Sequence, residues 1–157
     1  LGYTTGGFSI SVTDYWFNGG PGYFHYGSHN TNHTFEAQIG YDFGPLTLNW
    51  YTNFAGTDGV NNEGNRAYSS YISATVPFTL AGLEWKAEIG ATPWATDFYN
   101  YSEDPVCNGS NGFTVCDISL GAAKEIRITD SFSVPAFAKV TVNPRTEGAY
   151  FVFGLSF

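Results

Sequence analysis

Hydrophobic and polar residues alternate along most of the chain with a period of two. In the stretch FEAQIGYDF, for example, Phe, Ala, Ile, Tyr and Phe take every second place, with Glu, Gln, Gly and Asp between them. This period is typical of β-strands, whose successive side chains point to opposite faces, whereas an amphipathic helix has a period of 3.6. The pattern predicts an all-β chain with eight strands, at residues 8–16, 33–43, 46–54, 67–78, 82–92, 113–128, 132–142 and 149–157.

Short and long connections alternate between the predicted strands. Tight turns are predicted at 44–45, 79–81 and 129–131, and longer connections, rich in Gly, Asn, Asp and Ser, at 17–32, 55–66, 93–112 and 143–148. An even number of strands joined in this way places the tight turns and both chain ends at the same end of the strands. We therefore predict a single domain over 1–157, folded as an eight-stranded antiparallel up-and-down β-barrel.

The two faces of the predicted strands differ in character. One face carries large apolar side chains on nearly every strand, and the other carries small polar residues with a few charges. A water-exposed outer surface is expected to carry many Lys and Glu residues, whereas small polar side chains suit the crowded interior of a narrow barrel. The pattern therefore favours a transmembrane barrel with its apolar face toward lipid; a soluble β-sandwich with an aromatic core is the alternative.

Aromatic residues gather near both ends of the predicted strands, as in the two aromatic girdles of membrane barrels. Phe43, Phe78, Phe132 and Phe157 lie near the tight turns, and Trp16, Phe54, Tyr68, Trp94 and Phe151 near the longer connections. Two charged residues fit the apolar face poorly. Lys124 would cost about 2–4 kcal/mol at the membrane midplane, so we expect a β-bulge there or a position near the interface. Asp14 has the same problem next to a long connection.

Composition narrows the classes of partner. Charged residues make up only 13% of the chain, and the formal net charge is −8. Six scattered Lys and Arg residues cannot form the basic patch that nucleic acid or an anionic membrane surface requires, so neither is a predicted partner. No apolar run approaches the roughly 20 residues of a transmembrane helix, and no stretch has the pattern of a signal peptide, so we expect any export signal to have been removed.

The last residues, YFVFGLSF, place aromatic or aliphatic side chains at every second position and end in Phe. They resemble the last strand of bacterial outer-membrane β-barrels, and the whole chain resembles the eight-stranded OmpA/OmpX type. The stretches NWYTNFAG and KEIRITDSFSVPAFAKVTVNP look like porin-like barrels of the Bacteroidota related to the TorF family. The resemblance implies a Gram-negative outer membrane, with the long connections extracellular and both termini periplasmic. It also implies a C-terminal signal read by the barrel-assembly machinery, at Phe151, Phe153, Leu155 and Phe157.

Two cysteines, Cys107 and Cys116, stand in the stretch CNGSNGFTVC. Turn-forming residues separate them, and no neighbouring Cys or His completes a metal-ligand set. We predict a local disulfide, which would place this loop in an oxidising compartment; two free thiols are the alternative.

Three histidines, His25, His29 and His33, recur at a spacing of four. On a helix this spacing would place three ligands on one face, but nothing else in the segment favours a helix, so no metal site is predicted. His25, Ser28 and Asp97 are residue types that a lipid-modifying or proteolytic membrane enzyme would use, but their spacing is not diagnostic. We therefore expect no catalytic residues and no cofactor.

Charged residues on the polar face are predicted to line the barrel interior, at Glu36, Asp42, Glu84, Lys86, Glu88, Asp117 and Lys139. In a narrow barrel such residues form either an ionic network that braces the wall or, because acids outnumber bases, a path that prefers cations. The connection at 93–112 adds candidates for contact with a partner or with the lipid edge, at Trp94, Phe98, Tyr99 and Tyr101.

Together these features predict a non-enzymatic outer-membrane protein in contact with lipid. The first hypothesis is a structural or accessory subunit that binds a larger outer-membrane complex through its loops or outer wall. The alternatives are a small porin-like protein with a narrow, cation-preferring lumen and, as a third class, a lipid-modifying enzyme.

Overall fold

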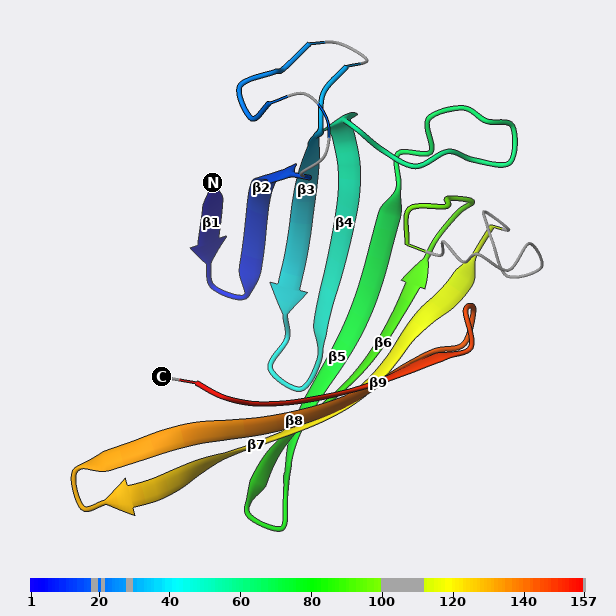
Figure 1. Ribbon diagram of the computed structural model, residues 1–157. Coiled ribbons are helices and arrows are strands. Elements are labelled where there is room, and N and C mark those ends of the chain that lie inside the picture. The colour runs from blue at the N-terminus through cyan, green and yellow to red at the C-terminus, as the bar shows by residue number, and fades with distance from the viewer. Residues whose placement is uncertain (18–19, 21, 28–29, 100–111, 157) are drawn as a thin grey trace.

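The computed structural model describes residues 1–17, 20, 22–27, 30–99 and 112–156. Over this part of the chain, nine β-strands form one antiparallel sheet in which each strand pairs with its neighbour in sequence (Figure 1). The strands are β1 (Gly2–Thr5), β2 (Phe8–Trp16), β3 (His33–Asp42), β4 (Thr47–Gly56), β5 (Ser70–Leu80), β6 (Leu83–Thr92), β7 (Thr114–Thr129), β8 (Phe132–Asn143) and β9 (Gly148–Leu155). No helix in these residues is long and apolar enough to cross a membrane.

The all-β, antiparallel, up-and-down arrangement predicted from the alternating pattern is confirmed. Strands β2 to β9 correspond to the eight predicted segments, with ends shifted by a few residues. Strand β1 was not predicted; it has 4 residues and pairs with β2 through a tight turn.

The sheet is open, so the predicted closure into an eight-stranded barrel is not found. β1 occupies the edge of β2 that β9 would need, with Gly2 opposite Ser11 and Thr5 opposite Phe8. Within the described residues, β9 pairs with β8 alone. The sheet twists strongly along its length, so that β7 to β9 cross the direction of β1 to β4 in Figure 1.

Cross-strand pairing gives the sheet two chemically different faces. The apolar face includes Ile10, Ile39, Leu48, Trp50, Ile72, Val76, Phe78, Trp85, Ile89, Ile118, Leu120, Val140, Phe151 and Phe153. The polar face includes Tyr15, Glu36, Gln38, Asn49, Tyr51, Asn53, Tyr71, Ser73, Thr75, Lys86, Glu88, Gly90, Asp117, Ser119, Lys139 and Thr141. The predicted separation of apolar and polar residues onto opposite faces is therefore present in the structure.

Over β3 to β7, burial is inverted relative to a soluble protein, because buried side chains lie on the polar face while large side chains of the apolar face are exposed. Asn53, Ser73 and Ser119 are buried, whereas Ile89 is 49% exposed and Phe153 is 66% exposed. Tyr71 packs directly on the backbone of Gly90, where an added Cβ would lie 1.9 Å from the Tyr71 hydroxyl. The most tightly packed part of the sheet is thus made largely of hydroxyl, amide and phenol groups.

A β-bulge near the start of β7 resets the phase of this long strand. Gly90 pairs with Asp117 and Ala91 with Val115, so Cys116 is an extra residue on β7. Beyond the bulge, Lys124 lies on the apolar face opposite Ala136. The bulge expected at Lys124 itself is absent.

Lys124 instead lies at the tight-turn end of the neighbouring strand. The last pair between β6 and β7 joins Glu84 to Ala123, so Lys124 falls just beyond it, level with the turn between β5 and β6. Its own strand, β7, continues past it to Thr129, paired with β8. From there a long lysine side chain can extend away from the apolar surface.

Candidate functional site

A tyrosine cluster surrounds Glu36 on the polar face. The Tyr15 hydroxyl donates to Glu36 Oε1 at 3.2 Å, and the Tyr99 hydroxyl donates to Oε2 at 3.4 Å. Tyr51 and Tyr71 continue the cluster, with ring centroids 6.0 Å apart, and the Tyr99 ring lies 5.7 Å from that of Tyr71. Each carboxylate oxygen of Glu36 therefore has a phenol donor, one from β2 and one from the connection after β6.

Tyr99 belongs to a connection that folds over the polar face. Burial, followed by the charge and the hydrogen bond of Glu36, raises the pKa of Tyr99 above its usual value of 10.0. The phenol is therefore neutral at physiological pH and acts as a donor. Phe98 packs edge-on against Tyr99, with centroids 5.0 Å apart, whereas Trp94 contacts Trp50 of the apolar face at 5.6 Å. The predicted contact residues are thus divided between the two faces, and Tyr101 lies outside the described residues.

Backbone and hydroxyl contacts fix this connection to the sheet. The hydroxyls of Thr96 and Ser69 lie 2.6 Å apart in a buried contact, and the Trp94 indole donates to the Ala67 carbonyl at 2.9 Å. Asp97 Oδ1 accepts the Val60 backbone N–H at 2.8 Å. Asp97 therefore joins two connections. Ser28, which with His25 and Asp97 made up the set of enzyme-like residue types, lies outside the described residues.

Hydroxyl groups bind two further acids of the polar face. Thr75 donates to Glu88 Oε2 at 2.8 Å across β5 and β6. On β7, the Ser119 hydroxyl contacts both Asp117 and, at 2.9 Å, the hydroxyl of Thr141. The Thr75–Glu88 and Ser119–Thr141 contacts form cross-strand links of the kind that would brace a wall.

The two lysines of the polar face share one cross-strand row. Lys86 and Lys139 lie on either side of Gly121 and line a groove of about 560 Å³ together with Glu84. Among the described residues neither lysine forms an ion pair. Asp42 lies apart from this groove, because its carboxylate accepts the Gly44 backbone N–H at 2.7 Å in the turn between β3 and β4.

A buried acid at the long-loop end was not predicted. Asp58 Oδ1 accepts from the Asn53 amide at 3.2 Å, and Oδ2 accepts from the Ser69 backbone N–H at 3.2 Å. Arg66 Nε lies 3.6 Å from the same Oδ2. Arg66 also donates to the Gly56 carbonyl at 2.7 Å and lies 5.3 Å from the ring centroid of Tyr68. Asp58 thus joins β4 to the connection that leads into β5.

A second unpredicted cluster lies on the apolar face, at the long-loop end of β2 and β3. His33 is fully buried, and its Nδ1 lies 2.7 Å from Asp14 Oδ1. This pairing explains how Asp14, an apparent misfit, is accommodated beside apolar residues. In the part of the chain that is described, no group of three His, Cys, Asp or Glu side chains is placed to hold a metal ion. His29 lies outside the described residues.

Cys116, the extra residue of the β7 bulge, is a buried free cysteine. Cys107, its predicted disulfide partner, lies outside the described residues. The structure therefore gives no support to the predicted disulfide, and the alternative of free thiols describes Cys116.

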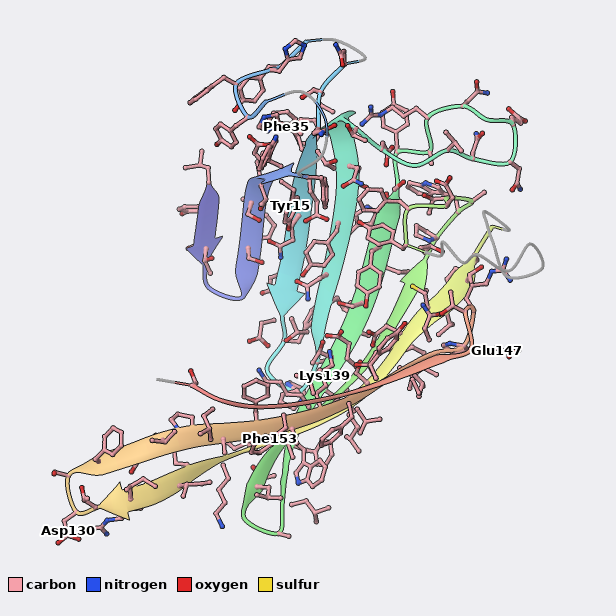
Figure 2. The ribbon with its side chains drawn as sticks, viewed as in Figure 1. Tyr15, Phe35, Asp130, Lys139, Glu147 and Phe153 are labelled. Carbon is pink, nitrogen blue, oxygen red and sulfur yellow. The ribbon has the colours of Figure 1, made fainter. Side chains whose placement is uncertain are left out.

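The predicted C-terminal signal lies on β9. Phe151, Phe153 and Leu155 all project from the apolar face and are exposed; Figure 2 labels Phe153, and also Lys139 on the adjacent β8. Phe157 lies outside the described residues. The exposed row of large side chains continues the apolar face to the edge of the sheet.

The chain matches no protein-family model, no curated protein and no solved structure.

Proposed function

We propose that the sheet forms the wall of a transmembrane β-barrel in the bacterial outer membrane, with the apolar face in contact with lipid and the polar face lining an aqueous lumen. The single observation that carries the proposal is the inverted burial of the two faces. Over β3 to β7, large aliphatic and aromatic side chains are exposed on the apolar face, and the more buried polar face is built from small polar residues, tyrosines and charges. Water would disfavour such a surface by about 25 cal/mol for each Å² of apolar area, whereas lipid would not.

The total exposed area supports the same conclusion. The accessible surface is 10013 Å². A soluble monomer of 17.1 kDa is expected to expose about 7,800 Å². The excess of about 2,200 Å² is the area that a single open sheet leaves uncovered on its two faces. A surface of this kind requires a cover, and a bilayer supplies one along the whole apolar face.

The outer membrane is proposed as the location because of the resemblance of the last strand to those of outer-membrane barrels. On this proposal lipid is the constant partner, and the barrel-assembly machinery is the partner during insertion. The long connections would be extracellular.

For the lumen, we favour passage of small polar solutes with a preference for cations. Glu36, Glu88 and Asp117 place three carboxylates on the polar face, and a negative lining attracts cations. Tyr99 narrows the space above Glu36 by reaching over the sheet. The porin-like alternative is preferred to the accessory subunit because Tyr99, one of the residues predicted to contact a partner, instead binds Glu36 on the polar face. No enzymatic role is proposed.

Membrane insertion can be tested with the native tryptophans. Trp50 and Trp85 both lie on the apolar face. In vesicles whose acyl chains carry bromine, a heavy-atom quencher, their fluorescence should be strongly quenched relative to vesicles of ordinary lipid. Unchanged fluorescence in protein that floats with the vesicles would contradict lipid contact.

The lumen function can be tested by conductance. Glu36→Gln should reduce the preference for K⁺ over Cl⁻ in a planar bilayer, because it removes a charge from the lumen. Glu147→Gln is the matched control, since Glu147 lies in the exposed turn between β8 and β9 (Figure 2). A bilayer that stays sealed, with protein shown to be inserted, would reject the channel and leave the membrane wall standing.

A further inference from the structure

His33 connects two strands to a long connection through both of its ring nitrogens. Nδ1 faces the Asp14 carboxylate of β2 at 2.7 Å, and Nε2 contacts the backbone carbonyl oxygen of Tyr23. The ring of Tyr26 stacks on the imidazole with a centroid distance of 4.1 Å, and Tyr23 meets it edge-on at 5.1 Å. The side chain is fully enclosed by these groups.

Both partners of the imidazole are oxygen acceptors. A neutral imidazole carries one N–H, and a backbone carbonyl has no proton to give. The two contacts together therefore require one proton more than a neutral histidine and an aspartate carboxylate hold. Because a carboxylic acid is the stronger acid, that proton belongs on His33, which is then an imidazolium. The carboxylate and the carbonyl compensate the charge that burial would otherwise disfavour.

The neighbours of His33 determine what else could titrate with it. The titratable groups packed against the ring are the Asp14 carboxylate from β2, whose side chain is 30% exposed, and the phenols of Tyr23 and Tyr26 from the connection. Phe35, also packed against the ring, does not titrate. Within the described residues, Asp14 is thus the acid that can balance the imidazolium.

The backbone around His33 is held independently of its protonation. The Thr57 backbone N–H donates to the His33 carbonyl at 2.6 Å, and the Thr57 hydroxyl donates to the Thr31 carbonyl at 2.5 Å. Gly56 makes this approach possible, because at φ +74° an added Cβ would lie 2.0 Å from the His33 carbonyl oxygen. Loss of the ring proton would therefore change the side-chain contacts first.

The segment that His33 holds carries exposed aromatic side chains. We term its described residues, 22–27 and 30–32, the aromatic loop. Phe24 is 89% exposed and lies 5.1 Å from the ring of Tyr23, which in turn lies 5.9 Å from Trp16 of β2. Phe35 extends the same surface to Phe54 at 6.3 Å, so the loop is continuous with the apolar face. Tyr and Trp are the residues that favour the boundary between lipid and water.

We propose that the aromatic loop lies in the lipid headgroup interface and that the His33 imidazolium is the latch that holds it against the wall, so that deprotonation releases it. The location in lipid rests on the proposed function; the latch does not. Neutral His33 would keep one of its two hydrogen bonds and lose one that is strengthened by charge. This loss lowers the ratio of loop held against the wall to loop released from it by about 10- to 100-fold.

The protonation state can be read directly from ¹⁵N NMR of histidine side chains in the detergent-solubilised chain. At pH 7 both ring nitrogens of His33 should show the imidazolium shift, and His33→Gln assigns the signal. A His33 spectrum with one protonated and one unprotonated nitrogen at pH 7 would overturn the latch. This readout does not depend on the protein being in a membrane.

The loop position needs a second experiment, with a bimane label on Phe24→Cys in a Cys107→Ser, Cys116→Ser background. In vesicles with acyl chains brominated close to the headgroup, the label should be quenched at pH 7 and lose that quenching as the pH rises. In Asp14→Asn, the amide can donate to a neutral Nδ1, so quenching should persist at high pH. An identical pH response in both chains would overturn the proposal, whereas a purely structural role for Asp14 predicts loss of quenching at every pH.

Quenching of Trp50 in the same vesicles separates the two proposals. If Trp50 is quenched and the label is not, the wall is in lipid and the proposed position of the loop is wrong. If neither is quenched, the membrane proposal fails, and the NMR result still decides the latch.

Discussion

Replacing Leu120 with arginine tests which side of the wall meets lipid. Leu120 lies midway along β7, between Ala87 of β6 and Val140 of β8, and is 45% exposed. At the hydrocarbon midplane an outward arginine costs about 2–4 kcal/mol, which lowers the ratio of folded to unfolded protein by about 30- to 1,000-fold. At a half-exposed position in water, the same substitution usually costs within about 0.5 kcal/mol. The two environments therefore predict results that do not overlap.

Phe132→Arg is the matched control. Phe132 is exposed on β8 beside the tight turn that joins it to β7, so its arginine would lie near the interface, where the cost is about 0–1 kcal/mol. The assay is reversible unfolding in guanidinium chloride of protein folded into vesicles, followed by tryptophan fluorescence. Equal, small costs for the two variants would refute the assignment of the apolar face to lipid. Equal, large costs would show that the tight-turn end lies deeper in hydrocarbon than proposed.

Three further substitutions test the packing of the polar face and of the long-loop end. Tyr99→Phe should lower the unfolding free energy by about 0.5–1.5 kcal/mol at neutral pH. The raised pKa of Tyr99 in the folded protein means that its neutral phenol stabilises the fold below pH 10.0 and that this stabilisation is lost as the pH rises above that value. In unfolding series at increasing alkaline pH, the variant should therefore lose stability less steeply than the parent. Gly56→Ala, which places a Cβ 2.0 Å from a backbone oxygen, should lower thermal stability clearly more than Gly82→Ala, which has a similar φ of +72° and open space; similar losses would mean that the close approach is not retained in solution. Asp58→Asn should cost about 1–3 kcal/mol by weakening a buried charge pair, and limited proteolysis should then cut the 57–69 connection faster than in the parent.

The alternating pattern was sufficient for β2 to β9 because each of these strands repeats the pattern several times. Strand β1 was missed because its sequence, GYTT, is too short to show a period and has a single large apolar side chain. The predicted closure is not found in the described residues because it depends on which strand takes the free edge of β2, and the period of two carries no information about edges. The β1 hairpin takes that edge by a local turn, which costs less chain entropy than bringing the distant β9 to it.

For the candidate site, the pattern placed side chains on faces but did not reveal their partners. Glu36 lies on the polar face as expected, but the approach of Tyr99 depends on a connection 63 residues away in sequence. Asp14 did give a signal, as an acid within an apolar row, and its partner His33 lies 19 residues further along the chain. Asp58 gave no such signal in the sequence, because it lies in a connection rich in Gly and Asn, where an acidic residue is expected at the surface.

The odd number of strands in the described part of the chain limits how the wall can be completed. Successive strands of the meander run in opposite directions, so β1 and β9, the first and ninth, run in the same direction. Joined to each other they would form a parallel pair, which an all-antiparallel wall excludes. A wall that keeps β1 in place must therefore gain an odd number of strands between its two edges, and a wall of eight strands must first displace β1 from β2.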